Sequence, residues 1–180
     1  IPKENVLEIT VVSPYFDKEG KIIQQLQRDF SPQKINVFID ESGILPSEFP
    51  FEKYSNVKFY HWKDAKNDFN DNFNRLHAKL IHFQYLDKEI LLFGSANATI
   101  SALGDENNDG INSEVSLLIK REKSDENWLK QLQIKTPEKT IHYDIIKNFK
   151  KNNYTTENKI KLQNAILYVE NQSNRIVVFT

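Results

Sequence analysis

The sequence of 180 residues contains no cysteine, and it has no apolar run long enough to cross a membrane. Without cysteine there is no disulfide framework and no thiolate metal site. A transmembrane helix needs about 20 consecutive apolar residues, so we expect no membrane partner. These absences fit a cytoplasmic protein.

The chain also lacks an excess of charge of either sign, since 24 Lys and Arg stand against 25 Asp and Glu. This balance excludes a protein that binds nucleic acid through a uniformly basic surface. The charges are unevenly distributed, however. Residues 120–161 hold eleven basic and six acidic residues, whereas residues 40–71 hold seven acidic residues and four lysines. The basic segment is a candidate contact for a polyanion, and solvated helix faces are the alternative interpretation.

Apolar residues make up 39% of the chain, which is enough for the packed core of one domain. Runs rich in β-branched residues predict strands over 7–12, 34–39 and 57–62. Helical spacing of apolar residues predicts a helix over 18–30. Strand, helix and strand at this spacing are typical of a βαβ unit with parallel strands.

The second part of the chain predicts a β-hairpin, with strands over 76–86 and 89–93 and a turn between them. It is preceded by a polar loop over 63–74. Further elements are expected along the rest of the chain: a short helix over 96–103, a loop over 104–112, a strand over 113–119, helices over 125–132 and 143–151, and a terminal hairpin over 165–169 and 175–179.

Four polar side chains are predicted to converge at the ends of this hairpin. His77 and Lys79 are two residues apart in an apolar run, so they are expected on the same face of a strand. Gly94-Ser95-Ala96-Asn97 follows the next apolar run, and its small Gly-Ser pair lets backbone amides approach a ligand. An imidazole, an ammonium, a hydroxyl and a carboxamide in one place suit a phosphate beside a nitrogen nucleophile.

This chemistry predicts a role for each residue. Neutral His77 is a nitrogen nucleophile near pH 7, and Lys79 and Asn97 can bind the non-bridging phosphate oxygens. If a helix begins at Ala96, its first amides add partial positive charge. Glu114 can accept a hydrogen bond from the second nitrogen of the His77 ring, which would select its tautomer.

Each of these residues also has a purely structural interpretation. A histidine on an apolar strand is usually a core or edge residue, and Lys79 can extend its charge to solvent from such a strand. The turn at 94–97 can be a strand-to-helix connection with a polar cap. The joint occurrence of all of them favours the chemical interpretation.

The other histidines are not expected to act in catalysis. His82 shares the run with His77 but faces the opposite side, so we interpret it as structural. His61 and His142 have no polar company that would form a site. No histidines and carboxylates show metal-ligand spacing, so neither a metal nor a cofactor is predicted.

The motif residues resemble the signature of the phospholipase D superfamily, which combines His-x-Lys with Gly-Ser-x-Asn. An acidic residue in Asn-Ser-Glu matches the position that supports the histidine in smaller nucleases of this superfamily, and the segment after the first strand is also similar. The resemblance runs from about residue 6 to 120 and rests on Ser13-Pro14-Tyr15-Phe16, His77, Lys79, Gly94, Ser95, Asn97 and Glu114.

The resemblance implies an α/β fold, a phospholipase D-like α/β sandwich with a mixed central sheet, over residues 1–122. A helical extension would occupy 123–162, and a β element that continues beyond the chain would begin at 163–180. The implied activity is that of a metal-independent phosphodiesterase with a phosphohistidine intermediate. We expect a nuclease of the DNA-processing, restriction or helicase-associated kind, with DNA as partner and catalytic residues His77, Lys79, Ser95, Asn97 and Glu114.

Two departures from the signature bear on function. Gln84 stands where the signature has aspartate, which lipid-processing members usually keep, so a phospholipid hydrolase or phosphatidyltransferase is the weaker alternative. The chain also holds one motif, whereas active members combine two. The second is expected from a homodimer partner or from another part of a parent protein. A non-catalytic module for nucleic-acid binding or dimerisation is the third interpretation.

Overall fold

The computed structural model describes residues 1–65, 75–107 and 109–149, together with the backbone of two strands within 168–179. The fold is a mixed α/β structure around a six-stranded sheet with strand order β3-β2-β1-β4-β5-β6. Its strands are β1 (Glu8–Val12), β2 (Lys34–Ile39), β3 (Val57–His61), β4 (Leu80–Gln84), β5 (Lys88–Gly94) and β6 (Ser116–Glu122).

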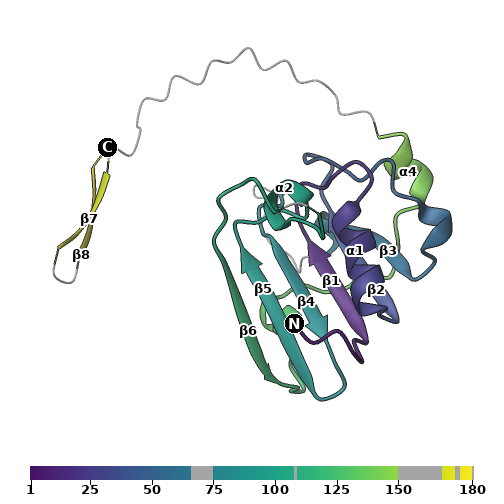
Figure 1. Cartoon of the computed structure of the whole chain (residues 1–180), viewed down its shortest axis with the longest axis horizontal. Helices are drawn as coiled ribbons and strands as arrows, with labels where there is room; N and C mark the ends of the chain where they lie inside the picture. The colour runs from purple at the N-terminus through teal and green to yellow at the C-terminus, as the bar shows by residue number, and fades with distance from the viewer. Residues whose placement is uncertain (66–74, 108, 150–167, 173–174, 180) are drawn as a thin grey trace, which may run out of the picture.

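The first half of the sheet is the predicted βαβ unit. Strands β1, β2 and β3 are parallel, and helix α1 (Lys21–Phe30) connects β1 to β2 across one face (Figure 1). The helix begins after Gly20, whose φ of 60° is one that glycine adopts without strain. Its buried residues Ile22, Ile23 and Leu26 pack in the same cluster as the strand residues beneath them.

The second half of the sheet is antiparallel. Strand β4 pairs with both β1 and β5, and β5 pairs with β6. The predicted hairpin is therefore confirmed, with its turn at residues 85–87. Strand β4 runs opposite to β1, and β5 runs opposite to β4. The first residues of β4 and the last residues of β5 therefore lie beside the C-terminal end of β1.

The segment that follows β6 packs against both faces of the sheet. Its helices are α3 (Trp128–Gln131) and α4 (Tyr143–Lys147). Ile141 and Ile146 join the core on the face covered by α1. Leu129 joins the core on the opposite face, together with Phe38 and Leu91. The domain boundaries at 122 and 162 remain a prediction.

A buried polar network lies under α3. His82 and Glu89 are each 1% exposed, and Nε2 of His82 lies 2.7 Å from Oε2 of Glu89. The side chain of Arg121 on β6 donates to the other carboxylate oxygen at 2.5 Å. The backbone N–H of Trp128 donates to the same carboxylate at 3.2 Å. His82 is thus structural, as predicted, and the network attaches α3 to the hairpin.

Protonation of the network follows from burial and hydrogen bonding. Burial lowers the pKa of His82, although its bond to Glu89 acts in the opposite direction. Burial raises the pKa of the Glu89 carboxyl, but the hydrogen bonds from Arg121 and His82 lower it more, and the net direction is down. A neutral imidazole therefore donates to a carboxylate whose charge is balanced by the guanidinium.

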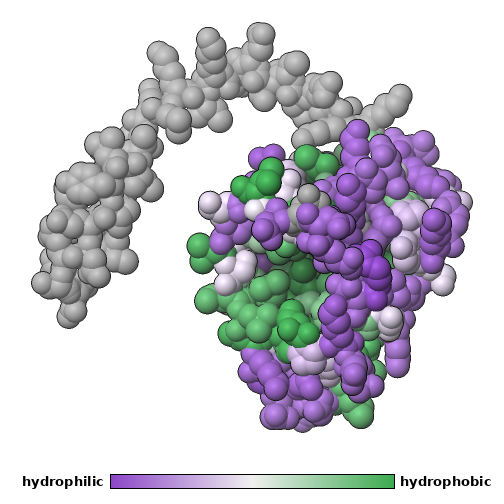
Figure 2. Space-filling view, in the orientation of Figure 1, coloured by the Kyte–Doolittle hydropathy of each residue, from purple (hydrophilic) through white to green (hydrophobic). Residues whose placement is uncertain are grey.

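Strand β6 forms an edge of the sheet with exposed apolar side chains. Leu117, Leu118 and Ile119 are 58%, 53% and 39% exposed. Figure 2 shows a broad hydrophobic area over the β4–β6 half of the sheet, whereas hydrophilic side chains dominate over α1. Exposed apolar area on an edge strand is characteristic of a surface that binds another molecule.

Several predicted elements have different bounds in the structure. The strand expected over 76–86 begins only at Leu80, and the one expected over 113–119 is shifted to 116–122. The helices expected over 96–103, 125–132 and 143–151 are shorter. Two short 3₁₀ turns also occur, and the second of them begins at Trp62, the last residue of the strand expected over 57–62. The shorter and additional elements are α2 (Ile100–Leu103), α3, α4, η1 (Phe51–Lys53) and η2 (Trp62–Ala65).

The C-terminal strands β7 (Tyr168–Gln172) and β8 (Arg175–Phe179) form an antiparallel pair that is separate from the six-stranded sheet. That they begin a further β element remains a prediction. Residues 66–74 of the loop expected over 63–74 lie outside the described residues, and so do residues 150–161 of the basic segment. Among the described helices, none has the length and apolar character to span a membrane.

Candidate functional site

The two motif segments meet where the β4–β5 hairpin opens. The backbone N–H of Gly94 donates to the carbonyl of Lys79 at 3.2 Å. This bond joins the His-x-Lys segment to the Gly-Ser-x-Asn segment, although they are fifteen residues apart in the chain. The prediction that His77 and Lys79 lie on a strand is wrong, because residues 75–79 are irregular and β4 begins at Leu80.

The His-x-Lys segment has one hydrogen bond to the end of β2 and one hydrogen bond within itself. The backbone N–H of Leu76 donates to the Asp40 carboxylate at 2.5 Å, at the end of β2. The Lys79 ammonium donates to the carbonyl of His77 at 2.9 Å. His77 is exposed and Lys79 is half-buried, so the imidazole is accessible to a substrate. The ammonium is held at the backbone of His77 by a bond that a phosphate can replace.

Gly94 is required by a close approach of backbone. A Cβ at this position would lie 2.2 Å from the carbonyl oxygen of Val115. The next residue, Ser95, binds the same strand: its N–H donates to the Val115 carbonyl, and its hydroxyl accepts from the Val115 N–H, both at 3.0 Å. The Gly-Ser pair therefore closes the end of the β5–β6 pairing.

Glu114 contacts the same turn. One of its carboxylate oxygens accepts a short hydrogen bond from the Ser95 hydroxyl, and the other accepts from the Asn112 side-chain amide at 3.3 Å. Ser95 and Glu114 are thus brought together as expected of one site. Among the described contacts, none joins Glu114 to His77, so the orienting role of Glu114 remains a prediction.

The expected helix start at Ala96 is wrong. Helix α2 begins at Ile100 after Thr99, so its first amides do not belong to the motif turn. The intervening residues are held instead by the end of β1. The Ser13 hydroxyl accepts from the Ala98 N–H at 3.0 Å, and the Asp17 carboxylate accepts from the Ile100 N–H at 3.1 Å.

Asp17 is partly desolvated where it caps this segment. Burial raises its pKa, and the hydrogen bond from Ile100 opposes that shift. The contacts of Ser13 and Asp17 explain physically why the segment after the first strand belongs with the motif. Ser13 and Asp17 position the turn at 95–99 through these hydrogen bonds. Sequence spacing alone does not indicate that the two segments are in contact.

Asn97 has an unsatisfied polar atom in the turn. Its side-chain Oδ1 is buried and has no hydrogen-bond partner among the described residues. A buried polar atom without a partner costs free energy. Because Oδ1 is an acceptor, its missing partner is a hydrogen-bond donor, and the side-chain amide N–H groups of Asn97 are the atoms that could donate to a phosphate.

An apolar groove of about 440 Å³ adjoins the motif residues. His77, Lys79 and Gly94 line it together with side chains from β4, β5, β6 and the α3 region. These further lining residues are Ala78, Leu80, Leu91, Phe93, Ile119, Trp128, Gln131 and Leu132. Sequence reasoning missed the contribution of Trp128 and Leu132, because they reach the groove only through the pairing of β6 with β5.

The remaining histidines do have carboxylate neighbours, contrary to expectation. Nδ1 of His61 lies 3.3 Å from Glu41, and Nδ1 of His142 lies 3.1 Å from Asp144. These are isolated pairs on the surface. Within the described parts of the chain, no group of three or more histidines and carboxylates is placed to hold a metal ion.

Several cations of the basic segment form intramolecular contacts. Arg121 is bound to Glu89 in the buried network, and Lys147 forms an ion pair with Glu52 at 2.9 Å. The Lys130 ammonium donates to the carbonyl of Asp125. The polyanion contact expected over 120–161 therefore depends on fewer cations than the sequence count indicates.

Comparison with known proteins gives a distant likeness among solved structures. No protein-family model matches the chain, and no curated protein matches it. Among solved structures, the crystal structure of the yeast tyrosyl-DNA phosphodiesterase is similar to 54% of this chain, at 16% sequence identity and a TM-score of 0.37. The match spans 23% of the length of that chain. This likeness is too low to assign a family.

Proposed function

We propose that this chain is a phosphodiesterase of the phospholipase D type that cleaves nucleic acid, with DNA as the expected substrate. The observation that carries the proposal is the hydrogen bond from Gly94 to Lys79, which joins the two motif segments at one edge of the sheet. An accessible imidazole, an ammonium and a carboxamide then lie on two adjoining segments. These groups supply a nucleophile and phosphate-binding donors for a metal-independent attack on phosphorus.

The proposed reaction has two displacements. A ring nitrogen of His77 attacks phosphorus, the bond to the leaving ester oxygen breaks, and a phosphohistidine forms. A proton from a second acid neutralises the leaving oxygen. Water then attacks phosphorus and gives a proton to the conjugate base of the second acid. The P–N bond breaks, and His77 and the second acid are regenerated together with a phosphate monoester.

The other site residues are proposed to bind the phosphate oxygens or to position the groups that do. Lys79 would exchange its bond to the His77 carbonyl for a phosphate oxygen, and Asn97 would donate to a phosphate oxygen from its side-chain amide N–H. Ser95 and Glu114 hold the turn that presents these groups. Glu114 is proposed to orient the imidazole when substrate is bound.

Hydrolysis is expected to survive removal of divalent cations. The proposed site neutralises phosphate charge with Lys79 and Asn97 and supplies its own nucleophile. The rate of hydrolysis of bis(p-nitrophenyl) phosphate should therefore be unchanged within about twofold after dialysis against EDTA. Loss of activity that Mg²⁺ or Zn²⁺ restores would contradict this mechanism.

The second motif is proposed to come from a second copy of the chain. One motif supplies one imidazole, whereas the reaction needs a nucleophile and a separate proton donor. A two-fold axis would place two identical faces together, each contributing His77, Lys79 and Asn97, with the loop over 104–112 at the rim. The competing source is another part of a parent protein.

The active species is accordingly expected to be a dimer. Sedimentation at tens of micromolar should give twice the mass of the chain, and activity should fall on dilution in parallel with dissociation. Mixing an excess of the inactive His77→Ala variant with the wild type should lower activity by forming mixed dimers. A monomer with unchanged activity per chain would eliminate the homodimer.

A further inference from the structure

We infer that the apolar groove beside His77 binds an unpaired nucleobase next to the phosphate that is cleaved, so that the preferred substrate is single-stranded nucleic acid. This inference rests on the proposed function and adds the strandedness of the substrate to it. Its premise is that His77, Lys79 and Gly94 line the groove and also belong to the motif. A phosphate bound by these residues has its ester substituents within reach of the groove.

The groove matches a ligand that is anionic at one part and apolar at another. The polar side chains among its described lining residues are His77, Lys79 and Gln131, and no acidic side chain is among them. All the other lining side chains are apolar. A nucleotide has this distribution, with a charged phosphate joined to a base whose faces are apolar.

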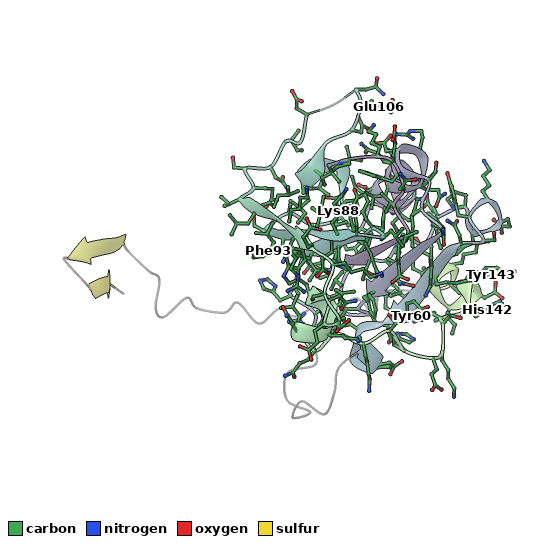
Figure 3. The ribbon with its side chains drawn as sticks, turned by 90° about the horizontal axis from the view of Figure 1, so that it is seen from below. Tyr60, Lys88, Phe93, Glu106, His142 and Tyr143 are labelled. Carbon is green, nitrogen blue, oxygen red and sulfur yellow. The ribbon has the colours of Figure 1, made fainter. Side chains whose placement is uncertain are left out.

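Two contacts position the Trp128 wall of the groove. The Trp128 backbone N–H is bound to the buried Glu89 carboxylate, and the Arg121 guanidinium lies over the Trp128 ring, 4.6 Å from its centroid. A fixed indole backed by a cation is a suitable stacking surface for a base of any sequence. Phe93, 36% exposed, adds a second aromatic side chain (Figure 3).

A hydrogen-bond donor favours a base over an acyl chain. The Gln131 side-chain oxygen accepts from Arg121 at 3.2 Å, which leaves its amide N–H groups as donors. Bases carry acceptors on their edges, whereas an acyl chain has none. A base within a duplex is already stacked and paired, and its entry would cost the free energy of flipping. The groove therefore favours unpaired strands.

The test uses the full chain with the His77→Ala substitution, which prevents turnover during binding. The probe is a fluorescent oligothymidylate of about eight nucleotides, and its affinity is measured by anisotropy against a hairpin duplex of the same length. Trp128→Leu is expected to weaken binding of the single strand by about 5- to 150-fold, the range for loss of one stacked base. The duplex should bind more weakly than the single strand, and its affinity should change little.

A matched control and a second variant keep the result interpretable. Tyr143→Leu removes an exposed aromatic side chain on α4, which lies on the opposite side of the molecule from Phe93 (Figure 3), and it should leave affinity unchanged. Leu132→Glu places a negative charge at an exposed position of the groove without disturbing the core. It should weaken binding about tenfold or more, with the thermal midpoint unchanged.

The outcomes separate this inference from the proposed function. Unchanged affinity in both Trp128→Leu and Leu132→Glu, or equal binding of duplex and single strand, would overturn the inference. The inference would also be overturned if the groove bound anionic phospholipid vesicles and not the oligonucleotide. It would be overturned as well if the wild type were a dimer and both substitutions converted it to a monomer, because the groove would then be the dimer contact. The proposed function fails separately if the wild type hydrolyses neither bis(p-nitrophenyl) phosphate nor oligonucleotides.

Discussion

Replacing His77 with alanine is expected to abolish phosphodiester hydrolysis while the protein stays folded. The imidazole is the proposed nucleophile, and removal of such a group costs several orders of magnitude in rate, about 10³-fold or more. His77 is exposed and outside the regular part of β4, so its loss removes no core packing. Turnover of bis(p-nitrophenyl) phosphate and of DNA measures the effect, and circular dichroism checks the fold.

His142→Ala is the matched control for this substitution. His142 is also exposed and lies just before α4, away from the motif edge of the sheet (Figure 3). Its ring nitrogen Nδ1 accepts a weak bond from the Asp144 N–H at 3.4 Å. Activity should be retained in this variant. Wild-type activity in His77→Ala would show that the nucleophile is elsewhere.

Of the substitutions proposed for this protein, Glu89→Ala is expected to cause the largest decrease in the free energy of unfolding. The carboxylate is 1% exposed and accepts bonds from His82, Arg121 and the Trp128 backbone. Removing one partner of a buried ionic network leaves the others desolvated and uncompensated, at a cost of about 3–5 kcal/mol. Urea unfolding should show this decrease in the free energy of unfolding.

Asp87→Ala is the control for the loss of a carboxylate on the same hairpin. The Asp87 side chain is 69% exposed, and its oxygen is 3.8 Å from the Lys88 ammonium. Exposed pairs of this kind contribute little, so the change should stay within about 0.5 kcal/mol. Equal stability of the Glu89→Ala and Asp87→Ala variants would contradict the role given to the network.

The same network predicts how wild-type stability depends on pH. The His82 pKa is lowered in the folded protein, so the unfolded chain takes up a proton first as the pH falls through the ordinary value of 6.5. The Glu89 pKa is also lowered, and its contribution is lost below the ordinary value of 4.5, as the pH falls through the folded value. Both effects act in the same direction, and stability should decline as the pH falls below about 6.5.

Local patterns predicted the regular elements well where burial is continuous. The apolar runs at β1, β2 and β3 and the helical spacing of α1 correspond to elements with nearly the predicted bounds. Period and apolar character are strong signals there, because one or both faces of each element are buried. The bounds were least accurate around the site, where residues 75–79 and 95–99 are held by side chains from distant strands.

The order of the motif residues was visible in the sequence by itself, since His77, Lys79, Gly94, Ser95 and Asn97 keep a recognisable spacing. Their types and the alternation of strands and helices were enough to predict a mixed α/β fold and a phosphate-type site. The mixed α/β fold is confirmed, because period and residue type along each element reflect its burial, and the phosphate-type site stays a prediction.

Tertiary structure alone decided what surrounds these residues. Ser13 and Asp17 hold the motif turn across more than eighty residues of chain, and Trp128 reaches the groove because β6 pairs with β5 and Glu89 binds the start of α3. These contacts join residues that are far apart in the chain, so they depend on the folded arrangement of the whole sheet and not on spacing between near neighbours.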